Sequence, residues 1–274
     1  MTLTSDGNDS GDRVISKETS FSHQANRVIT VRAVQFNLPV SVDRHWVRGS
    51  PFKTHLFNSL HLTLPAVEYW MVRHVQSRLK HITASPLRQN VRGFILQEAQ
   101  HAEQHAQFGE ILRQQGYELK ACLKMEDWIL TSLQRLDWRL NLAAIAGMEH
   151  LTVLLSEVVL ASDLLAAAEP TLKAMLEWHA LEEIEHKAVA YEVLQTVSQN
   201  YLLRVAGLAI GCAFVLGLLN RCTLTLLYQD RCLWRWSVWR EMGQFWLTKE
   251  KMLLRSVPHC LWYLQPNFHP AAHD

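Results

Sequence analysis

The sequence has almost no net charge and few cysteines. Its 27 lysines and arginines stand against 26 aspartates and glutamates, which leaves +1 over 274 residues. A chain without a basic excess has no long-range field to attract a nucleic-acid backbone, so we expect no nucleic-acid partner. The five cysteines show no CxxC spacing and lie mostly among apolar residues. This pattern is typical of free thiols in a reducing compartment and argues against a disulfide framework.

The N-terminus also lacks a secretory signal, because no apolar core follows a positively charged start. We therefore expect a cytoplasmic protein, with association at the inner face of the membrane left open. The polar tail and the irregular stretch around Pro39 and Gly49 predict a disordered or extended region over residues 1–50.

Period-two alternation, the mark of strands, is nearly absent between residues 64 and 200, whereas apolar residues recur at helical spacing. Pro65 suits a first helical position, and that helix is expected to run to about residue 80. Ser85-Pro86 and Gly116 bracket a second helix, residues 125–161 form a third, and Glu169-Pro170 opens a fourth that continues to about residue 198. The prediction is an all-α fold with a four-helix bundle over residues 51–200.

The stretch HALEEIEHK, residues 179–187, is dense in metal-ligand side chains. Glu183 and His186 are three residues apart, so they lie about 60° apart on one helix face and can bind the same ion. A lone ExxH is usually a solvated helix face. Here the same spacing recurs on the second expected helix, at Glu98 and His101.

Each ExxH pair follows a glutamate that is set in an apolar run. Glu68 lies in PAVEYWMV and Glu149 in LAAIAGMEHLTVLL, and a carboxylate buried there without a partner is costly. Glu98 follows Glu68 by 30 residues and Glu183 follows Glu149 by 34, so the chain repeats a helix-pair unit. Two such units related by a pseudo-two-fold axis predict a dinuclear site in the bundle. Oxygen and nitrogen donors without sulfur favour two iron ions and leave manganese or zinc open.

Two more histidines share these inward faces, one turn from the ExxH pairs. We expect His179 to be an added metal ligand and His105 to be a catalytic base or proton donor beside the metals. The plainer alternative is that both are core histidines. Glu182 is expected to be a hydrogen-bonding partner of His186 with a catalytic role, and Glu185 to lie on the solvated face. The expected metal ligands are Glu68, Glu98, His101, Glu149, His179, Glu183 and His186.

Residues 201–274 form a hydrophobic helix and a Trp-rich C-terminal region, packed on the bundle or on a membrane. Residues 205–219 are uncharged, but a helix of that length rises only about 22 Å, short of a hydrocarbon core of about 30 Å. A membrane span, an interfacial helix with peripheral membrane contact, and a helix packed on the protein's own core are the alternatives. Arginines and tryptophans in RCLWRWSVWR, residues 231–240, are typical of an interfacial belt.

The motifs together resemble the bacterial family of predicted metal-dependent hydrolases. The resemblance runs from about residue 50 to the C-terminus and implies a ferritin-like bundle with the ExxH pair and a dinuclear metal site. The matching pieces are LPAVEYW (64–70), QEAQHAEQH (97–105), EHLT (149–152), WHALEEIEHKAVAYEV (178–193) and PNFHP (266–270).

Three functions are compatible with such a site. The carboxylate-rich ligand set favours O2-dependent oxidation of a small apolar molecule at a non-haem di-iron centre, because apolar walls such as Phe94, Phe108, Leu142 and Ile145 suit an oily substrate. Hydrolysis by a metal-bound hydroxide is the first alternative. Non-catalytic metal binding is the second. Homodimer formation is left open.

Overall fold

The computed structural model describes residues 28–47 and 49–270. Within these ranges the protein is all-α, as predicted, and its β structure consists of an isolated bridge between Val47 and Ala168. The disordered tail expected at the N-terminus lies outside the described residues.

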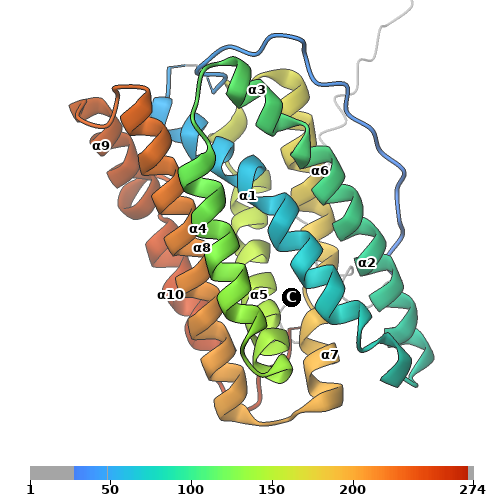
Figure 1. Ribbon diagram of the computed structural model, residues 1–274. Coiled ribbons are helices and arrows are strands. Elements are labelled where there is room, and N and C mark those ends of the chain that lie inside the picture. Colours follow the sequence, from blue (N-terminus) through green and yellow to red (C-terminus); the bar gives the residue numbers. More distant parts are fainter. Residues whose placement is uncertain (1–27, 48, 271–274) are drawn as a thin grey trace, which may run out of the picture.

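Four helices enclose the centre of the molecule (Figure 1). The first packs against the second, and the third against the fourth, in the two pairs that the sequence repeat predicts. A short helix, α7 (Val189–Val197), follows the fourth and packs on the third and the second. The four are α1 (Pro51–Gln76), α2 (Ser85–Ala106), α5 (Trp138–Ala161) and α6 (Pro170–His186).

The prediction that the first helix begins at Pro65 is wrong. The helix begins at Pro51, where Ser50 Oγ accepts the Lys53 N–H, and Pro65 lies inside it. Ser50-Pro51 is the same cap signal as Ser85-Pro86. An internal proline removes one backbone hydrogen bond, but burial of the helix on both sides of Pro65 compensates for that loss.

The other three expected helices are each divided. The second ends at Ala106, and α3 (Phe108–Gln114) follows. The third separates into α4 (Lys120–Gln134) and α5, because Asp137 accepts the Arg139 N–H and starts a new helix. The fourth ends at His186, where Lys187 bonds the carbonyl of Ile184 in a tighter turn. Two short 3-10 turns complete this part, η2 (Leu79–His81) and η3 (Asp163–Leu165).

Residues 28–47 run as an extended strap across α2 and α6 (Figure 1). The strap is held by side chains of α2: Asn90 accepts the Ile29 N–H, and Gln104 accepts the Phe36 N–H. On the α6 side, the ring of Phe36 packs against Trp178. The strap therefore closes the face of the bundle that lies over the two ExxH helices.

The long helix α8 (Tyr201–Gln229) packs on α5 and α1. A Cβ at Gly207 would lie 2.3 Å from the carbonyl carbon of Ala143, so the backbones of α5 and α8 touch here. Both α5 and α8 are long and apolar enough to cross a membrane by length and composition, but their burial differs. The most apolar window of α5 is 78% buried and that of α8 is 33% buried. The chain then continues through α9 (Trp236–Gly243), η4 (Gln244–Thr248) and α10 (Met252–Tyr263).

Candidate metal centre

The six residues of the repeated motif converge between α1, α2, α5 and α6, and all six are buried. Ligand atoms of Glu98, Glu149, Glu183 and His186 lie within 4.8 Å of one another. A second group with the same spacing overlaps the first through Glu98 and contains Glu68, Glu98 and His101. Two overlapping groups that share a glutamate are the arrangement that a dinuclear centre requires.

Most of the ligand atoms have no hydrogen-bonding partner among the described residues. Both carboxylate oxygens of Glu68, Glu98 and Glu149 are buried and unpartnered, as is Oε2 of Glu183. His101 and His186 each present an unpartnered Nδ1, and His186 Nδ1 lies 2.9 Å from Glu98 Oε1 without the alignment of a hydrogen bond. Unsatisfied polar atoms at this density are costly unless a cation binds them, so the residues present fit bound metal ions.

The pKa shifts within the cluster also indicate a site suited to cations. Burial, and after it the charges of Glu98 and Glu183, raises the pKa of Glu68 and Glu149 well above the usual carboxyl value. Burial alone would lower the pKa of His186, but the neighbouring Glu183 and Glu98 outweigh it and raise this pKa. The metal-free cluster thus holds protons in the place where cations would neutralise the carboxylates.

Each ExxH histidine is oriented by a residue of the opposite ExxH helix. His101 donates from Nε2 to Glu182 Oε2 at 3.0 Å, and His186 donates from Nε2 to Gln97 Oε1 at 2.9 Å. These bonds fix the tautomer that leaves Nδ1 free for a metal. The expected pairing of Glu182 with His186 is therefore wrong: a helical side chain one residue before Glu183 points across the interface toward α2.

The prediction that Glu185 lies on the solvated face is also wrong. Its side chain accepts the Gln97 amide N–H at 3.0 Å and is bonded by Arg32 of the strap. Arg32 also reaches Glu182 at 3.0 Å. Burial acts to raise the pKa of Glu182, but the bonds from His101 and Arg32 outweigh it and lower the pKa, so this carboxylate is ionised. Strap, α2 and α6 together hold the two histidines in place.

The additional histidines do converge, as their helix positions predict. His105 Nε2 lies 3.0 Å from His179 Nδ1, and His179 Nε2 lies 3.4 Å from Glu183 Oε1. A third buried imidazole extends this row, because His61 Nδ1 of α1 lies 2.7 Å from His105 Nδ1. Burial lowers the pKa of His61 and of His179 to about 3, so the row is neutral.

The tautomers of this row depend on one another. Each neutral imidazole has one N–H donor and one acceptor nitrogen. If His179 binds a metal through Nε2, its Nδ1 must donate to His105, and His105 must then donate from Nδ1 to His61. Sequence reasoning missed His61, Gln97 and Arg32 as partners of the site. His61 lies on the stretch of α1 that was expected to precede the helix. Only the helical spacing of HLFNSLH, residues 55–61, could have indicated this histidine.

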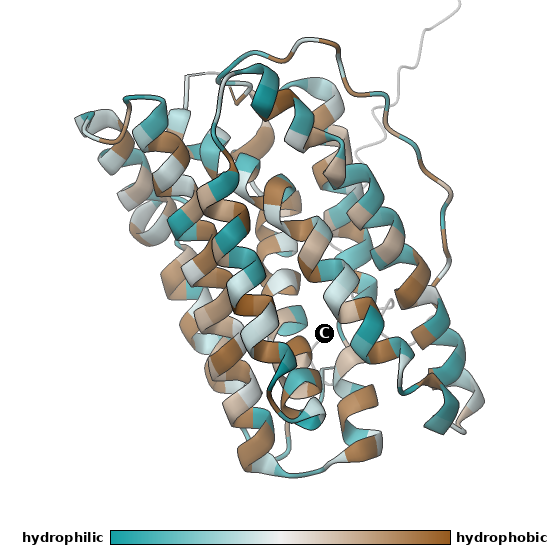
Figure 2. Cartoon of the chain, viewed as in Figure 1, coloured by the Kyte–Doolittle hydropathy of each residue, from teal (hydrophilic) through white to brown (hydrophobic). Residues whose placement is uncertain are grey.

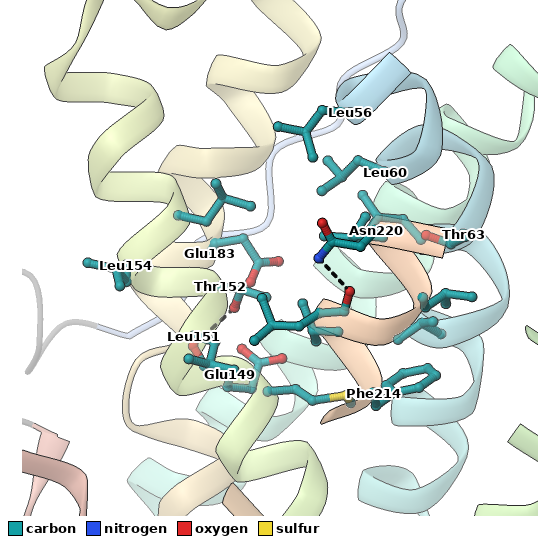
Figure 3. Close-up of a pocket in the computed structure, with 18 of the residues that line it drawn as sticks. Leu56, Leu60, Thr63, Glu149, Leu151, Thr152, Leu154, Glu183, Phe214 and Asn220 are labelled. Carbon is teal, nitrogen blue, oxygen red and sulfur yellow. Dashed lines mark hydrogen bonds between the residues drawn. The ribbon is translucent and has the colours of Figure 1, made fainter. Parts of the chain in front are cut away.

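A cavity of about 140 Å³ adjoins the candidate metal ligands on the α1, α5 and α8 side. Figure 3 shows Glu149 and Glu183 pointing into it between walls that include Leu56, Leu60 and Phe214. The volume is similar to that of engineered apolar cavities, about 150 Å³, that bind one benzene molecule. The expected wall residues Phe94, Phe108, Leu142 and Ile145 are buried in the core but do not line this cavity.

An all-α bundle around a buried cluster of glutamates and histidines defines the protein as a candidate metal-binding helical protein. The chain belongs to the family described as predicted metal-dependent hydrolase, whose sequence model matches residues 30–274. No curated protein and no solved structure matches the chain. The family assignment confirms the resemblance seen in the motifs, and its description supports a metal-dependent enzyme.

Proposed function

We propose that the protein is a dinuclear metal enzyme, with iron as the first choice of metal, that oxidises an apolar molecule with O2. In this proposal the bundle is of the ferritin-like kind, and Glu68, Glu98 and Glu149 are ligands together with Glu183. The two ExxH histidines and His179 complete the ligand set. A reduced di-iron centre supplies O2 activation. Insertion of one oxygen atom into a C–H bond consumes O2, two protons and two electrons from an external reductant and releases water.

The polarity of the cavity wall carries this proposal. Its hydroxyl and amide side chains are bonded to the backbone of their own helices. Thr152 donates to the carbonyl of Glu149 and Asn220 to that of Leu216 (Figure 3), and Thr63 and Ser256 donate in the same way to Ser59 and Met252. The other polar residues that line the cavity are the site carboxylates, His179 and Trp246, which has one indole N–H. The wall thus offers few hydrogen bonds to a polar substrate and suits a hydrocarbon segment next to the metals.

The protein's own residues would act in three ways. Glu182 and Gln97 hold the imidazoles that bind metal, as described above. The apolar wall excludes bulk water from the reacting carbon. His179 faces the cavity and is placed to bind a metal through Nε2, and His105, whose Nε2 lies 3.0 Å from His179 Nδ1, is placed to hold or move a proton.

Hydrolysis is the second candidate, and the family description favours it. A metal-bound hydroxide would then attack an apolar ester or amide, with His105 placed to pass a proton to the leaving group. The cavity wall would bind the acyl part of such a substrate. The two candidates therefore share the metal centre and the apolar substrate and differ in the need for O2.

The test begins with elemental analysis of the purified protein. Wild type should hold two metal ions per chain, and Glu98→Ala and Glu183→Ala should lose them. Glu103→Ala is the matched control, because Glu103 is an exposed glutamate of the same α2 helix. Unchanged metal content in both site variants would refute the metal centre.

The second stage separates the two reactions. Protein loaded with Fe(II) without oxygen should consume O2 and develop visible absorption when oxygen is admitted. Protein loaded with Zn(II) should not hydrolyse p-nitrophenyl esters of fatty acids. Ester hydrolysis without O2 uptake would favour the second candidate and overturn the first.

A further inference from the structure

The outward side of α8 is an apolar stripe. Exposed residues recur at steps of three or four, which places them on one line along the helix. No charged side chain interrupts the stripe before Arg221, and Leu202 is 73% exposed. Scattered apolar residues are ordinary on a protein surface, but a continuous stripe is not. Its members are Leu202, Ala206, Ala209, Ala213 and Leu216.

The segment after α8 extends this apolar surface. Trp234 and Trp236 are 80% and 78% exposed at the start of α9. The α10 helix exposes a second stripe of Leu253, Leu254, Val257 and Leu261. Tyr263 of α10 and Leu208 of α8 belong to one buried cluster, and α10 also packs on α5, the helix that α8 covers. Figures 1 and 2 show the helices α8 and α10 along the same side of the molecule. We call these exposed residues of α8, α9 and α10 the C-terminal face.

Residues 230–255 of the C-terminal face are rich in exposed basic side chains, whereas their acidic side chains are engaged internally. Asp230 is bonded to Arg44 and His45, Glu241 accepts the Ser50 hydroxyl, and Glu250 pairs with Lys53. This segment therefore presents exposed basic residues together with tryptophans and leucines, a composition typical of helices that bind an anionic bilayer surface. The exposed basic residues are Arg231, Arg235, Arg240, Lys249, Lys251 and Arg255.

The packing of α8 excludes an independent membrane span. Gly207 lies against the backbone of Ala143 and Gly211 against Met148, so α8 cannot separate from α5 without opening the core. The α5 helix in turn carries Glu149 of the metal centre. Contact with a bilayer must then use the outer side of α8 while its inner side stays in the bundle.

The cavity beside the metals ends at this same surface. Leu216 both lines the cavity and is 45% exposed. Trp246 of η4 and Ser256 of α10 also line the cavity. An apolar molecule could therefore pass from the C-terminal face to Glu149 and Glu183 without crossing water.

We propose that the C-terminal face docks on an anionic phospholipid bilayer, and that the apolar substrate enters the cavity from the bilayer between α8 and α10. The second half of this statement rests on the proposed function. The docking itself does not, and it can be measured without turnover.

The test is co-sedimentation of the full chain with vesicles that contain phosphatidylglycerol, with pure phosphatidylcholine vesicles for comparison. Wild type should bind the anionic vesicles at low salt and more weakly at high salt. Lys249→Glu with Arg255→Glu should weaken binding about thirtyfold or more. Lys120→Glu with Lys124→Glu, exposed lysines of α4, is the matched control and should bind like wild type.

A second pair of variants tests the apolar contact. Trp234→Ser with Trp236→Ser should weaken binding about tenfold or more, whereas Trp128→Ser, an equally exposed tryptophan of α4, should not. Circular dichroism and metal content should stay at wild-type values in all of these variants. Equal loss in the control variants, or no binding of wild type to anionic vesicles, would overturn the proposal. A dimer that forms without lipid and dissociates on substitution of Trp234 and Trp236, as measured by sedimentation velocity, would also overturn the proposal.

Discussion

Replacement of Glu149 by leucine tests whether this residue is a metal ligand or a carboxylate that stabilises the fold. Glu149 is 1% exposed, and neither of its oxygens has a hydrogen-bonding partner among the described residues; His186 Nδ1 lies 3.8 Å from Oε2. If its role is to bind metal, the metal-free protein gains by losing it. We expect Glu149→Leu to stabilise the metal-free protein and to reduce the stabilisation that added metal provides.

The magnitude follows from the cost of burying this group. Burial, Glu183 and Glu98 raise the pKa of Glu149 well above its usual value, so the folded, metal-free protein disfavours the ionised carboxylate. A buried polar group without a hydrogen-bonding partner costs about 1–3 kcal/mol, and leucine removes that cost. Because the folded pKa is the higher one, the cost is smallest at low pH and grows as the pH rises. For a chain of this size, about 1–3 kcal/mol raises the melting temperature by about 2–10 °C.

Glu126 of α4 provides a matched control. It is also buried, Oε1 has no partner, and burial raises its pKa to about 8, but it lies outside the metal groups. Glu126→Gln should gain a similar amount at neutral pH with metal present or absent. Its advantage should vanish near pH 4.5 and stop growing above about pH 8.

The assay is thermal or denaturant unfolding of chelator-treated and metal-loaded protein at several pH values. Glu126→Gln should keep the full metal-induced shift, whereas Glu149→Leu should lose most of it, since stabilisation by a ligand falls with its affinity. A metal-free Glu149→Leu protein that is much less stable than wild type would refute the reasoning and show that Glu149 has a structural partner. An undiminished metal-induced shift in that variant would do the same.

Three further outcomes are expected. Glu182→Gln should lower the affinity of the metal held near His101 by about 10–100-fold, measured by competition with a chelator, and unchanged affinity would count against the orienting role of this carboxylate. His179→Ala should lower metal occupancy, whereas His105→Ala should retain the metals and slow the O2-dependent absorption change; wild-type behaviour of both would leave them as core histidines. Gly207→Val should lower the free energy of unfolding by about 1–3 kcal/mol or more in denaturant titrations, and a negligible loss would disprove the close approach of α5 and α8.

The parts of the site that could be predicted from the sequence are those in which spacing within a single helix determines the positions of the side chains. The i, i+3 spacing places Glu98 beside His101 on any regular helix, and a glutamate such as Glu149 in an apolar run needs a buried partner wherever the helix packs. The repetition of both features then indicated how the helices pair. Helix boundaries were less certain, because Pro65 is compatible with either a helix start or a buried helix interior.

The contacts that could not be predicted join segments far apart in the chain. Arg32 reaches Glu182 across 150 residues, and His61 reaches His105 across 44. Neither contact leaves a periodic pattern, because the strap is extended and His61 is one of several histidines near the start of α1. The direction of Glu182 toward His101 depends on the crossing of α2 and α6, which a single helix does not specify.

In the proposed dinuclear site, the pairing of these two helices would make the two metal positions unequal. Gln97 and Glu182 occupy the same place in the repeat, immediately before the ExxH glutamate, yet one is an amide and the other a carboxylate. An ionised carboxylate that accepts the His101 N–H increases the electron density at the opposite nitrogen more than the amide does for His186. Arg32 moderates the difference, because it shares the charge of Glu182 with His101. The metal next to His101 should therefore be bound by the more basic imidazole, so the two ions of the pseudo-symmetric site need not have equal affinity.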